Sequence, residues 1–302
     1  MMVVKINRLK KQFNSLEVIK GLDFELKKGT CVALLGANGA GKTTTLQMLS
    51  GLMRPSSGSI SFSGIKAGED FRKMIGYLPQ HAYFYEWMTG EEFLEYAGKL
   101  AGLNKPIAKE RTKELLELVG IADAKNRRIG KYSGGMKQRL GIAQAIIHQP
   151  NLVMLDEPVS ALDPFGRREV LELLEKLKKE TTILFSTHIL NDAEEVCDEI
   201  LFLHDGKIVE SGTMDELREK HQQAKIDVMF RGNPERFVEQ LSQVMNIESI
   251  TYEGNIASMF VEKVEEAKKI ILQEAIEKDW PLLKFEISRT SLEDVFMKVV
   301  QK

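Results

Sequence analysis

The residues whose types and spacing point most directly to chemistry form a glycine-rich loop. The loop reads Gly36-Ala37-Asn38-Gly39-Ala40-Gly41-Lys42-Thr43, which is the pattern G-x-x-x-x-G-K-[ST]. Because glycine has no Cβ, the backbone N–H groups of such a loop can approach phosphate oxygens closely. Lys42 can reach the two outer phosphates, and the Thr43 hydroxyl can ligate Mg²⁺. The alternative is a glycine-rich turn that binds nothing.

The segments on either side of this loop favour the phosphate-binding interpretation. Cys31–Leu35 is a short apolar run that predicts a buried strand, and Thr44–Leu49 predicts a helix. Strand, glycine loop and helix is the context in which this motif holds phosphates. The helix N-terminus adds unsatisfied N–H donors and a positive dipole end, so Thr44 joins the expected binding residues. The sequence therefore predicts a nucleoside triphosphate site.

Two carboxylates follow a second apolar run. Leu152–Leu155 predicts a buried strand, and Asp156 and Glu157 come directly after it, before Pro158. An Asp at the carboxyl end of such a strand lies beside the phosphate loop, where it can hold Mg²⁺ through water. Glu157, one residue on, is placed to orient or deprotonate a water that attacks the γ-phosphate. The alternative is a solvated acidic turn.

A second glycine pair also opens a predicted helix. It lies in the run Ser133-Gly134-Gly135-Met136-Lys137-Gln138. A serine hydroxyl, two residues without a Cβ and a helix N-terminus make a second candidate anion site. Taken alone, the same run is equally an N-capped helix with no ligand.

Size and composition limit the possible classes of protein. The chain has 302 residues, enough for two domains, with 43% hydrophobic and 28% charged residues. The formal net charge is −2, so we expect no nucleic-acid partner. No apolar run approaches the roughly 18 residues that a membrane span needs. Cys31 and Cys197 stand in apolar surroundings without metal-ligand spacing, which predicts buried thiols in a reducing cytosol.

The elements that must position these residues divide into two predicted domains. Short apolar strands alternate with amphipathic helices up to about residue 211, an α/β pattern, and residues 90–149 predict an inserted helical subdomain. We predict a first domain over residues 1–221, a polar connecting helix over 214–224, and a second domain over 222–302. The second domain is expected as β-α-β-β-α-β, a small ferredoxin-like α+β unit. Its predicted elements are strand 225–230, helix 234–245, strands 247–252 and 256–261, helix 265–278 and strand 282–287.

The motifs, in this order, resemble those of ATP-binding cassette (ABC) ATPase subunits over residues 3 to about 215. The resemblance implies a P-loop NTPase cassette that binds ATP and Mg²⁺, with Gly36–Thr43 as Walker A, Asp156-Glu157 as the end of Walker B and Ser133–Gln138 as the signature loop. It further implies catalytic roles for Lys42, Glu157 and His188, the last as the switch histidine on the γ-phosphate. It places Mg²⁺ at Thr43, Gln80 and Asp156, with Gln80 also sensing the coupling interface.

The remaining nucleotide contacts also follow from the resemblance. The D-loop residue Asp163 and the signature residues Ser133, Gly134, Gly135 and Met136 would act on ATP. Phe13 would stack on adenine, and its alternative is an ordinary strand-face phenylalanine. Two residues depart from the usual signature Leu-Ser-Gly-Gly-Gln, because Tyr132 replaces the Leu and Met136 the Gln. The backbone donors remain, so we expect binding to survive.

The resemblance also implies partners and a place of action. The signature of one cassette completes the nucleotide site of another, so this chain must pair with a second copy or a paralogue. An integral membrane permease would dock at the aromatic cluster Tyr83, Phe84, Tyr85 and Trp87, whose alternative is the core of the helical subdomain. The protein would then be cytoplasmic and peripheral at the inner face of the cell membrane.

Three classes of function are weighed: an ATPase that drives a separate permease, an ABC protein acting on DNA or ribosomes, and a stand-alone NTPase switch. One cassette without a coiled-coil insertion or basic patch favours transport. The tail Ser291–Phe296 reads as a capped helix with a hydrophobic face. It resembles the tail of multidrug, antibiotic and sodium exporter cassettes, so export is expected. An importer cassette with a regulatory C-terminal domain is the alternative. For the second domain we expect dimer stabilisation or permease docking, with ligand sensing as the alternative.

Overall fold

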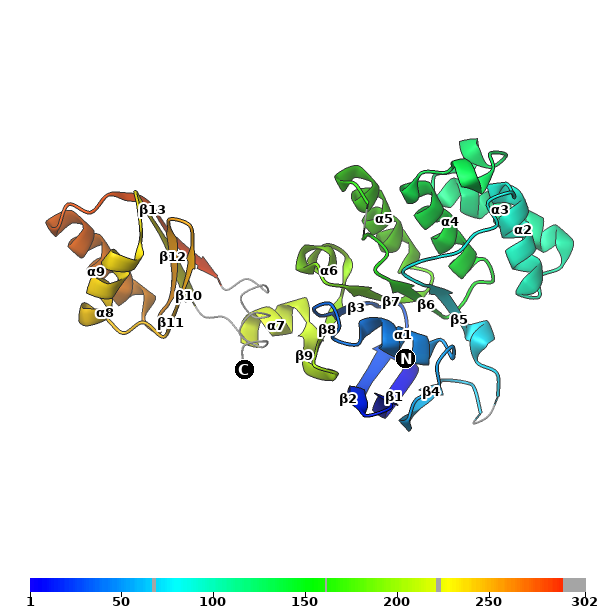
Figure 1. The fold of residues 1–302 in the computed structure, drawn as a ribbon, viewed down its shortest axis with the longest axis horizontal. Coiled ribbons are helices and arrows are strands. Elements are labelled where there is room, and N and C mark those ends of the chain that lie inside the picture. Colours follow the sequence, from blue (N-terminus) through cyan, green and yellow to red (C-terminus); the bar gives the residue numbers. More distant parts are fainter. Residues whose placement is uncertain (67–68, 161, 221–223, 290–302) are drawn as a thin grey trace. The chain divides into compact units, whose positions relative to one another are not determined.

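The computed structural model describes residues 1–302 except 67–68, 161, 221–223 and 290–302 (Figure 1). The chain forms two compact units, Met1–Met214 and Asp215–Lys302. The predicted boundary after residue 221 lies a little later, beside residues outside the described part, and stays a prediction.

The first unit is built around a six-stranded sheet in the order β5-β6-β7-β3-β8-β9. The first five strands of that order run parallel, and β9 is antiparallel to β8. The central strands are fully buried, as expected of unbroken apolar runs covered on both faces. The predicted strands at Cys31–Leu35 and Leu152–Leu155 are therefore confirmed. The bounds are β3 Cys31–Leu35, β5 Ile75–Leu78, β6 Leu152–Asp156, β7 Thr182–Thr187, β8 Glu199–His204 and β9 Lys207–Thr213.

A second, antiparallel sheet of three strands, β2-β1-β4, packs against the first. It consists of β1 Met2–Phe13, β2 Leu16–Lys27 and β4 Ser57–Phe62. Helix α1 (Lys42–Leu49) lies on this side of the large sheet, while α5 (Pro164–Leu177) and α6 (Leu190–Val196) cover the opposite face (Figure 1). The core between the two sheets includes the fully buried side chains of Leu22, Leu34 and Leu46. This packing holds α1, and the loop before it, in a fixed place.

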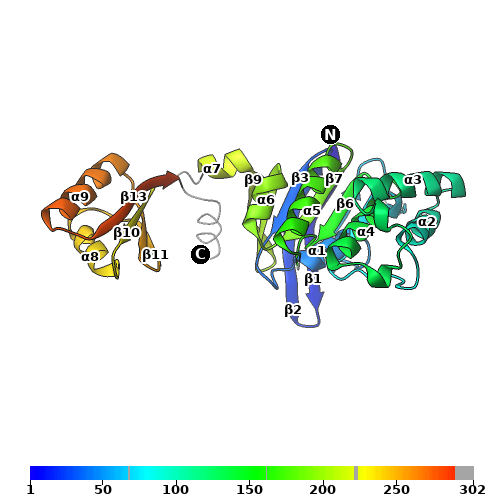
Figure 2. The same cartoon turned by 90° about the horizontal axis from the view of Figure 1, so that it is seen from above.

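The helical subdomain lies at the end of the large sheet that β5 and β6 form, with α4 in contact with both strands (Figures 1 and 2). It contains α2 (Gly90–Leu100), α3 (Lys105–Leu118) and α4 (Gly134–Ile146). Two of these helices begin at residues whose side chains cap the helix N-terminus. Thr89 forms a capping box with Glu92 at α2, and the Asn104 carboxamide accepts the Ile107 N–H at α3.

The second unit has one four-stranded antiparallel sheet in the order β11-β12-β10-β13. Its chain order is β-α-β-β-α-β, so the predicted ferredoxin-like arrangement is confirmed. The core centres on Phe230, which stacks on Phe237 at a centroid distance of 4.4 Å and meets Trp280 edge-on. The bounds are α7 Met214–Lys220, β10 Ala224–Phe230, α8 Glu235–Val244, β11 Ser249–Glu253, β12 Ile256–Phe260, α9 Val264–Glu277 and β13 Leu282–Arg289. The predicted capped helix at Ser291–Phe296 lies outside the described residues.

Among the described residues, no helix combines the length and the apolar character needed to cross a bilayer. Cys31 and Cys197 are both buried free thiols, as predicted, and their Sγ atoms lie 3.8 Å apart.

Candidate active site

The glycine-rich loop joins the end of β3 to the start of α1. Gly41 caps α1 in the left-handed region with φ +107°, and a Cβ there would lie 2.5 Å from Ile19 Cδ1. A Cβ on Gly36 would lie 2.3 Å from the Leu203 carbonyl oxygen. Both positions therefore require glycine, and the loop keeps the close, backbone-lined shape that can surround a phosphate.

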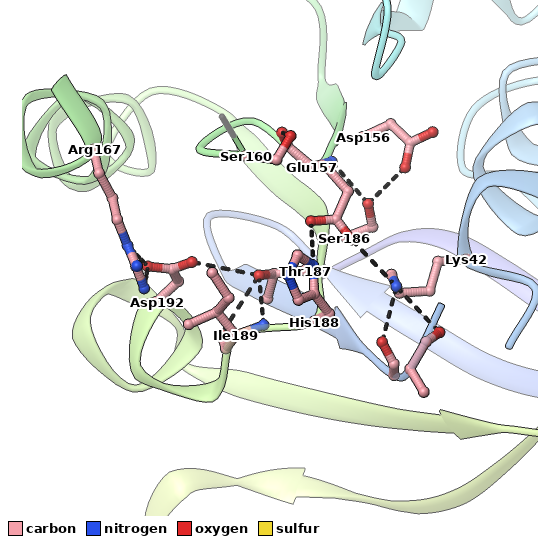
Figure 3. Close-up of polar contacts among 12 residues, drawn as sticks. Lys42, Asp156, Glu157, Ser160, Arg167, Ser186, Thr187, His188, Ile189 and Asp192 are labelled. Atoms are coloured by element: carbon pink, nitrogen blue, oxygen red, sulfur yellow. Dashed lines mark hydrogen bonds and ion pairs between the residues drawn. The ribbon is translucent and has the colours of Figure 1, made fainter. Parts of the chain in front are cut away.

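Lys42 lies at the centre of the site. Its side chain is 6% exposed, and Nζ donates to the carbonyl oxygens of Gly36 at 2.8 Å and Ala37 at 3.3 Å. The same ammonium lies 3.2 Å from Glu157 Oε1 (Figure 3). A cation at the N-terminus of a helix such as α1, where the first N–H groups have no partner within the helix, is a setting that attracts a polyphosphate.

Asp156 ends β6 and is almost wholly buried, at 1% exposure. The Ser186 hydroxyl donates to its Oδ1 at 2.6 Å, while its buried Oδ2 has no hydrogen-bond partner among the described residues. Burial raises the pKa of this carboxyl, and the hydroxyls of Ser186 and Thr43 act against that rise. A buried oxygen without a donor is suited to a cation or a bound water.

The oxygens around Asp156 fit Mg²⁺. A carboxylate and the Thr43 hydroxyl are the hard donors that this cation prefers. In the described part of the chain, no three His, Cys, Asp or Glu side chains gather as a metal cage. Mg²⁺ usually keeps several waters and is bound through one or two carboxylates together with phosphate oxygens of the substrate.

Glu157 links the two halves of the site. Its backbone lies in the left-handed region with φ +51°, and its N–H donates to Ser186 Oγ at 2.9 Å. The Ser160 hydroxyl donates to its carbonyl oxygen, also at 2.9 Å. A non-glycine residue in that region costs energy and is common at functional sites. The backbone turn directs the carboxylate of Glu157 away from β6 and toward Lys42 and His188.

His188 follows β7 and contacts Glu157 from the other side. Its Nδ1 lies 2.9 Å from Glu157 Oε2, and its side chain is 42% exposed (Figure 3). One carboxylate therefore bridges an ammonium and an imidazole. Such an arrangement can hold a water near a phosphate, take its proton and contact the transferred group.

Sequence reasoning missed Ser186, which holds both carboxylate residues of Walker B. Asp156 and Ser186 are register partners on the parallel strands β6 and β7. The Ser186 hydroxyl donates to Asp156 and accepts from the Glu157 N–H. The available signal was a polar residue at the carboxyl end of an apolar run, the same signal that identified Asp156.

The other predicted ATP contacts lie on separate elements. Ser133 caps α4 and accepts the Met136 N–H at 3.2 Å, and Asp163 caps α5 and accepts the Gly166 N–H at 2.7 Å. Gln80 is exposed just after β5. No hydrogen bond or ion pair among the described residues joins these side chains to the group formed by Lys42, Asp156, Glu157 and His188. Their roles stay predictions.

Phe13 is 43% exposed at the end of β1, with Lys11 Nζ 5.0 Å from its ring centroid. Its ring is accordingly not part of the core. Contact with adenine stays a prediction.

The predicted aromatic cluster splits between surface and subdomain. Tyr83 is 94% exposed and Trp87 69%, whereas Phe84 packs edge-on against Phe93 of α2 at 5.3 Å. Together with α2 and α4, this segment forms an open groove of about 570 Å³, here called the aromatic groove. Its lining includes Tyr83, Phe84, Tyr85, Phe93, Tyr96 and His148.

Comparisons with known proteins agree with this geometry. The family model described as ABC transporter matches residues 19–160, and that for the C-terminal domain of DrrA1-3-like ATP-binding proteins matches residues 212–300. The ABC transporter ATP-binding protein YxlF of Bacillus subtilis (strain 168) is 45% identical over 298 residues, 99% of each chain. The bacitracin transport ATP-binding protein BcrA of Bacillus licheniformis is 33% identical, over 99% of this chain and 97% of its own.

A solved structure shares the fold. It is the dimeric, post-hydrolysis state of the ATP-binding cassette MJ0796 bound to ADP and Pi. The match has a TM-score of 0.63 at 25% identity and covers 70% of this chain and 98% of that one.

Proposed function

The chain belongs to the family of ABC transporter ATP-binding proteins, and from this premise we propose that it hydrolyses ATP at Lys42, Glu157 and His188 to drive a separate membrane exporter. Members of this family are ATPases. The observation that supports the residue assignment is the bridge from the Lys42 ammonium through the Glu157 carboxylate to the His188 ring.

In the proposed reaction, each of these residues has one task. Lys42 moves from Glu157 to the β- and γ-phosphate oxygens, where its charge offsets the charge that develops in the transition state. Glu157 then orients the attacking water and accepts its proton. His188, held beside Glu157 at 2.9 Å, contacts the γ-phosphate from the opposite side. Asp156 would offer its buried carboxyl oxygen Oδ2 to the metal ion.

Mg²⁺ is proposed as the metal of this site. When bound, it neutralises charge on the β- and γ-phosphates. Thr43 and Asp156 would hold it, the latter through the buried Oδ2 that lacks a partner among the described residues. Gln80 is exposed on the loop after β5 and is the proposed third contact.

A second cassette is proposed to complete the site. Ser133, Gly134 and Gly135 open α4 at an exposed or half-exposed surface, so their N–H groups face outward at a helix N-terminus. The dimeric MJ0796 cassette supports such a pairing. Because the γ-phosphate would contact both chains, ATP favours the closed pair and hydrolysis releases it.

The permease is proposed to dock at the aromatic groove. Exposed aromatic side chains on a monomer surface are typical of interface hot spots. Glu86 lies within the same segment, and its Oε1 is 3.0 Å from Nζ of Lys137. Lys137 belongs to α4, the helix that begins at the signature loop. A permease docked there, at the inner face of the membrane, would contact the exposed aromatic segment directly. Through the Glu86–Lys137 ion pair, a movement of that segment would reach α4, the signature helix.

Export is the proposed direction. BcrA is named for bacitracin transport, and residues 212–300 match the C-terminal domain of DrrA1-3-like proteins. The second unit is proposed to stabilise the dimer or to contact the permease.

Capture of partners tests this function. Glu157→Gln should hold the closed, ATP-bound pair, so it is used as bait in detergent with ATP and Mg²⁺, and the eluate is identified by mass spectrometry. We expect a multi-span membrane protein. The same bait with Tyr83→Ser and Tyr85→Ser is the matched control, and it should bind ATP but lose that protein. Ribosomes or DNA in place of a membrane protein would contradict the transport function.

A further inference from the structure

An ion pair between a buried aspartate and a half-buried arginine lies next to the catalytic group and takes no part in the proposed reaction. Asp192 of α6 is 1% exposed, and Arg167 of α5 reaches it across the gap between the two helices (Figure 3). Arg167 Nε donates to Asp192 Oδ1 at 2.5 Å, and Nη2 contacts the same oxygen. A buried carboxylate is costly unless it is paired and hydrogen-bonded, so such a pair calls for an explanation.

The second oxygen of Asp192 faces the loop that carries His188. Thr187 is fully buried, and its Oγ1 lies 3.4 Å from Asp192 Oδ2. The same hydroxyl accepts the Ile189 N–H at 3.0 Å. Thr187 and Ile189 are the two neighbours of His188 in the chain. One hydroxyl therefore ties together the residues on both sides of His188, and Asp192 faces that hydroxyl.

We propose that Arg167, Asp192 and Thr187 are positioning residues that hold the backbone of His188 so that its ring meets Glu157. The proposal rests on the proposed role of His188 in ATP hydrolysis. The His188 side chain is 42% exposed, and within the described part of the chain its ring hydrogen-bonds to one side chain, that of Glu157, so few contacts of its own hold it. The direction of the His188 ring depends on the backbone of its loop. The Thr187 hydroxyl fixes that backbone because it accepts the Ile189 N–H. Burial raises the pKa of the Asp192 carboxyl, and the Arg167 guanidinium acts against that rise.

The same contacts tie His188 to the beginning of α5. The Arg167 N–H donates to the Asp163 carbonyl oxygen at 2.9 Å, and the Asp163 carboxylate caps Gly166 one residue earlier. The first turn of α5, which carries Asp163, is thus linked through Arg167 and Asp192 to the His188 loop. A displacement of Asp163 would reach His188 by this route.

Thr187→Val and Thr187→Ser form a matched pair that tests the proposal. Valine keeps the buried volume and removes the hydroxyl, whereas serine keeps the hydroxyl. We expect Thr187→Val to lower kcat by about 10- to 100-fold, the range for a small misplacement of a catalytic group. Its Kd for a fluorescent ATP analogue should stay within about twofold. Thr187→Ser should keep kcat within about threefold of wild type. The readouts are phosphate release at saturating Mg-ATP by the full chain, nucleotide binding and thermal melting.

The same change in a His188→Ala background separates positioning from general destabilisation. A residue that acts through His188 has no further effect once His188 is gone, so Thr187→Val should then leave kcat unchanged. Arg167→Lys gives a second test at a partly exposed residue, should Thr187→Val fail to fold. It keeps the charge and loses the guanidinium fork, so kcat should fall by about 3- to 10-fold.

The outcomes distinguish a failure of the positioning role of Thr187 and Arg167 from a failure of the catalytic role of His188. If His188→Ala lowers kcat while Thr187→Val and Arg167→Lys keep it within twofold, the positioning proposal is wrong and the site assignment stands. Full additivity of Thr187→Val with His188→Ala would also overturn it. If His188→Ala itself keeps normal turnover, the proposed role of His188 fails, and the positioning proposal fails with it.

Discussion

Lys42 Nζ and Glu157 Oε1 lie 3.2 Å apart, and the side chains of both residues are more than nine-tenths buried. Each charge stabilises the other in a place where neither would be stable alone. A triphosphate that enters the loop offers Lys42 more negative charge than one carboxylate does. Binding would therefore release Glu157 toward the attacking water, which couples nucleotide binding to the freeing of the base.

The first prediction concerns the affinity for nucleotide. Lys42→Ala should weaken ATP binding by at least about 10-fold, because it removes charge-assisted hydrogen bonds to phosphate of about 1.5–3 kcal/mol each. Titration with a fluorescent ATP analogue measures the effect. Lys28→Ala, at an exposed lysine after β2, is the matched control and should bind normally. Unchanged affinity in Lys42→Ala would refute the phosphate-loop assignment.

The second prediction concerns stability and pH. Burial raises the pKa of Asp156 in the folded chain, so the folded state binds more protons than the unfolded state, and stability falls as pH rises through the raised pKa. Asp156→Asn removes the buried charge and should raise Tm at pH 7.5 without nucleotide by about 2–4 °C for each kcal/mol gained.

Melting curves at several pH values check the sign. The advantage of Asp156→Asn should shrink as the pH is lowered toward the raised pKa of the wild-type carboxyl. Asp123→Asn, at an exposed aspartate, should leave Tm unchanged at every pH. A lower Tm for Asp156→Asn at pH 7.5 would show that this carboxylate stabilises the fold.

The third prediction concerns the independence of the two units. Among the residues that the structure describes, the hydrophobic cores of the two units share no member, so a chain ending at residue 221 should fold and bind ATP as the full chain does. In the full chain, Phe230→Ala should destabilise the second unit by about 3–5 kcal/mol and leave the unfolding transition of the first unchanged. Calorimetry resolves the two transitions. Loss of ATP binding in the shortened chain would contradict the predicted boundary.

Much of the fold could be predicted because its signals are contiguous. The strands at Cys31–Leu35 and Leu152–Leu155 are unbroken apolar runs, and the phosphate loop is an unbroken motif between a strand and a helix. Strand β4 (Ser57–Phe62) was not predicted, because the run Ser-Gly-Ser-Ile-Ser-Phe has few residues with strand preference. It forms because β1 offers an edge with which it can pair.

The contacts within the site were harder to foresee. Glu157 and His188 were predicted to be catalytic, but the bridge from Lys42 through Glu157 to His188 depends on the neighbouring strands β3, β6 and β7. Arg167 and Asp192 meet only because α5 packs on α6, and neither belongs to a motif. The roles of Ser133 and Asp163 in ATP binding depend on contacts with a second chain, and they stay predictions.

The measurement that tests the account most directly compares wild type with Glu157→Gln in two assays. ATP affinity should stay within about threefold, since the amide keeps the shape of the side chain. Phosphate release should fall by about 100-fold or more, because the amide cannot accept the proton of the attacking water. Glu172→Gln, at an exposed glutamate of α5, is the matched control and should hydrolyse ATP at the wild-type rate. Near-normal release by Glu157→Gln would show that another group is the base and would contradict the central claim.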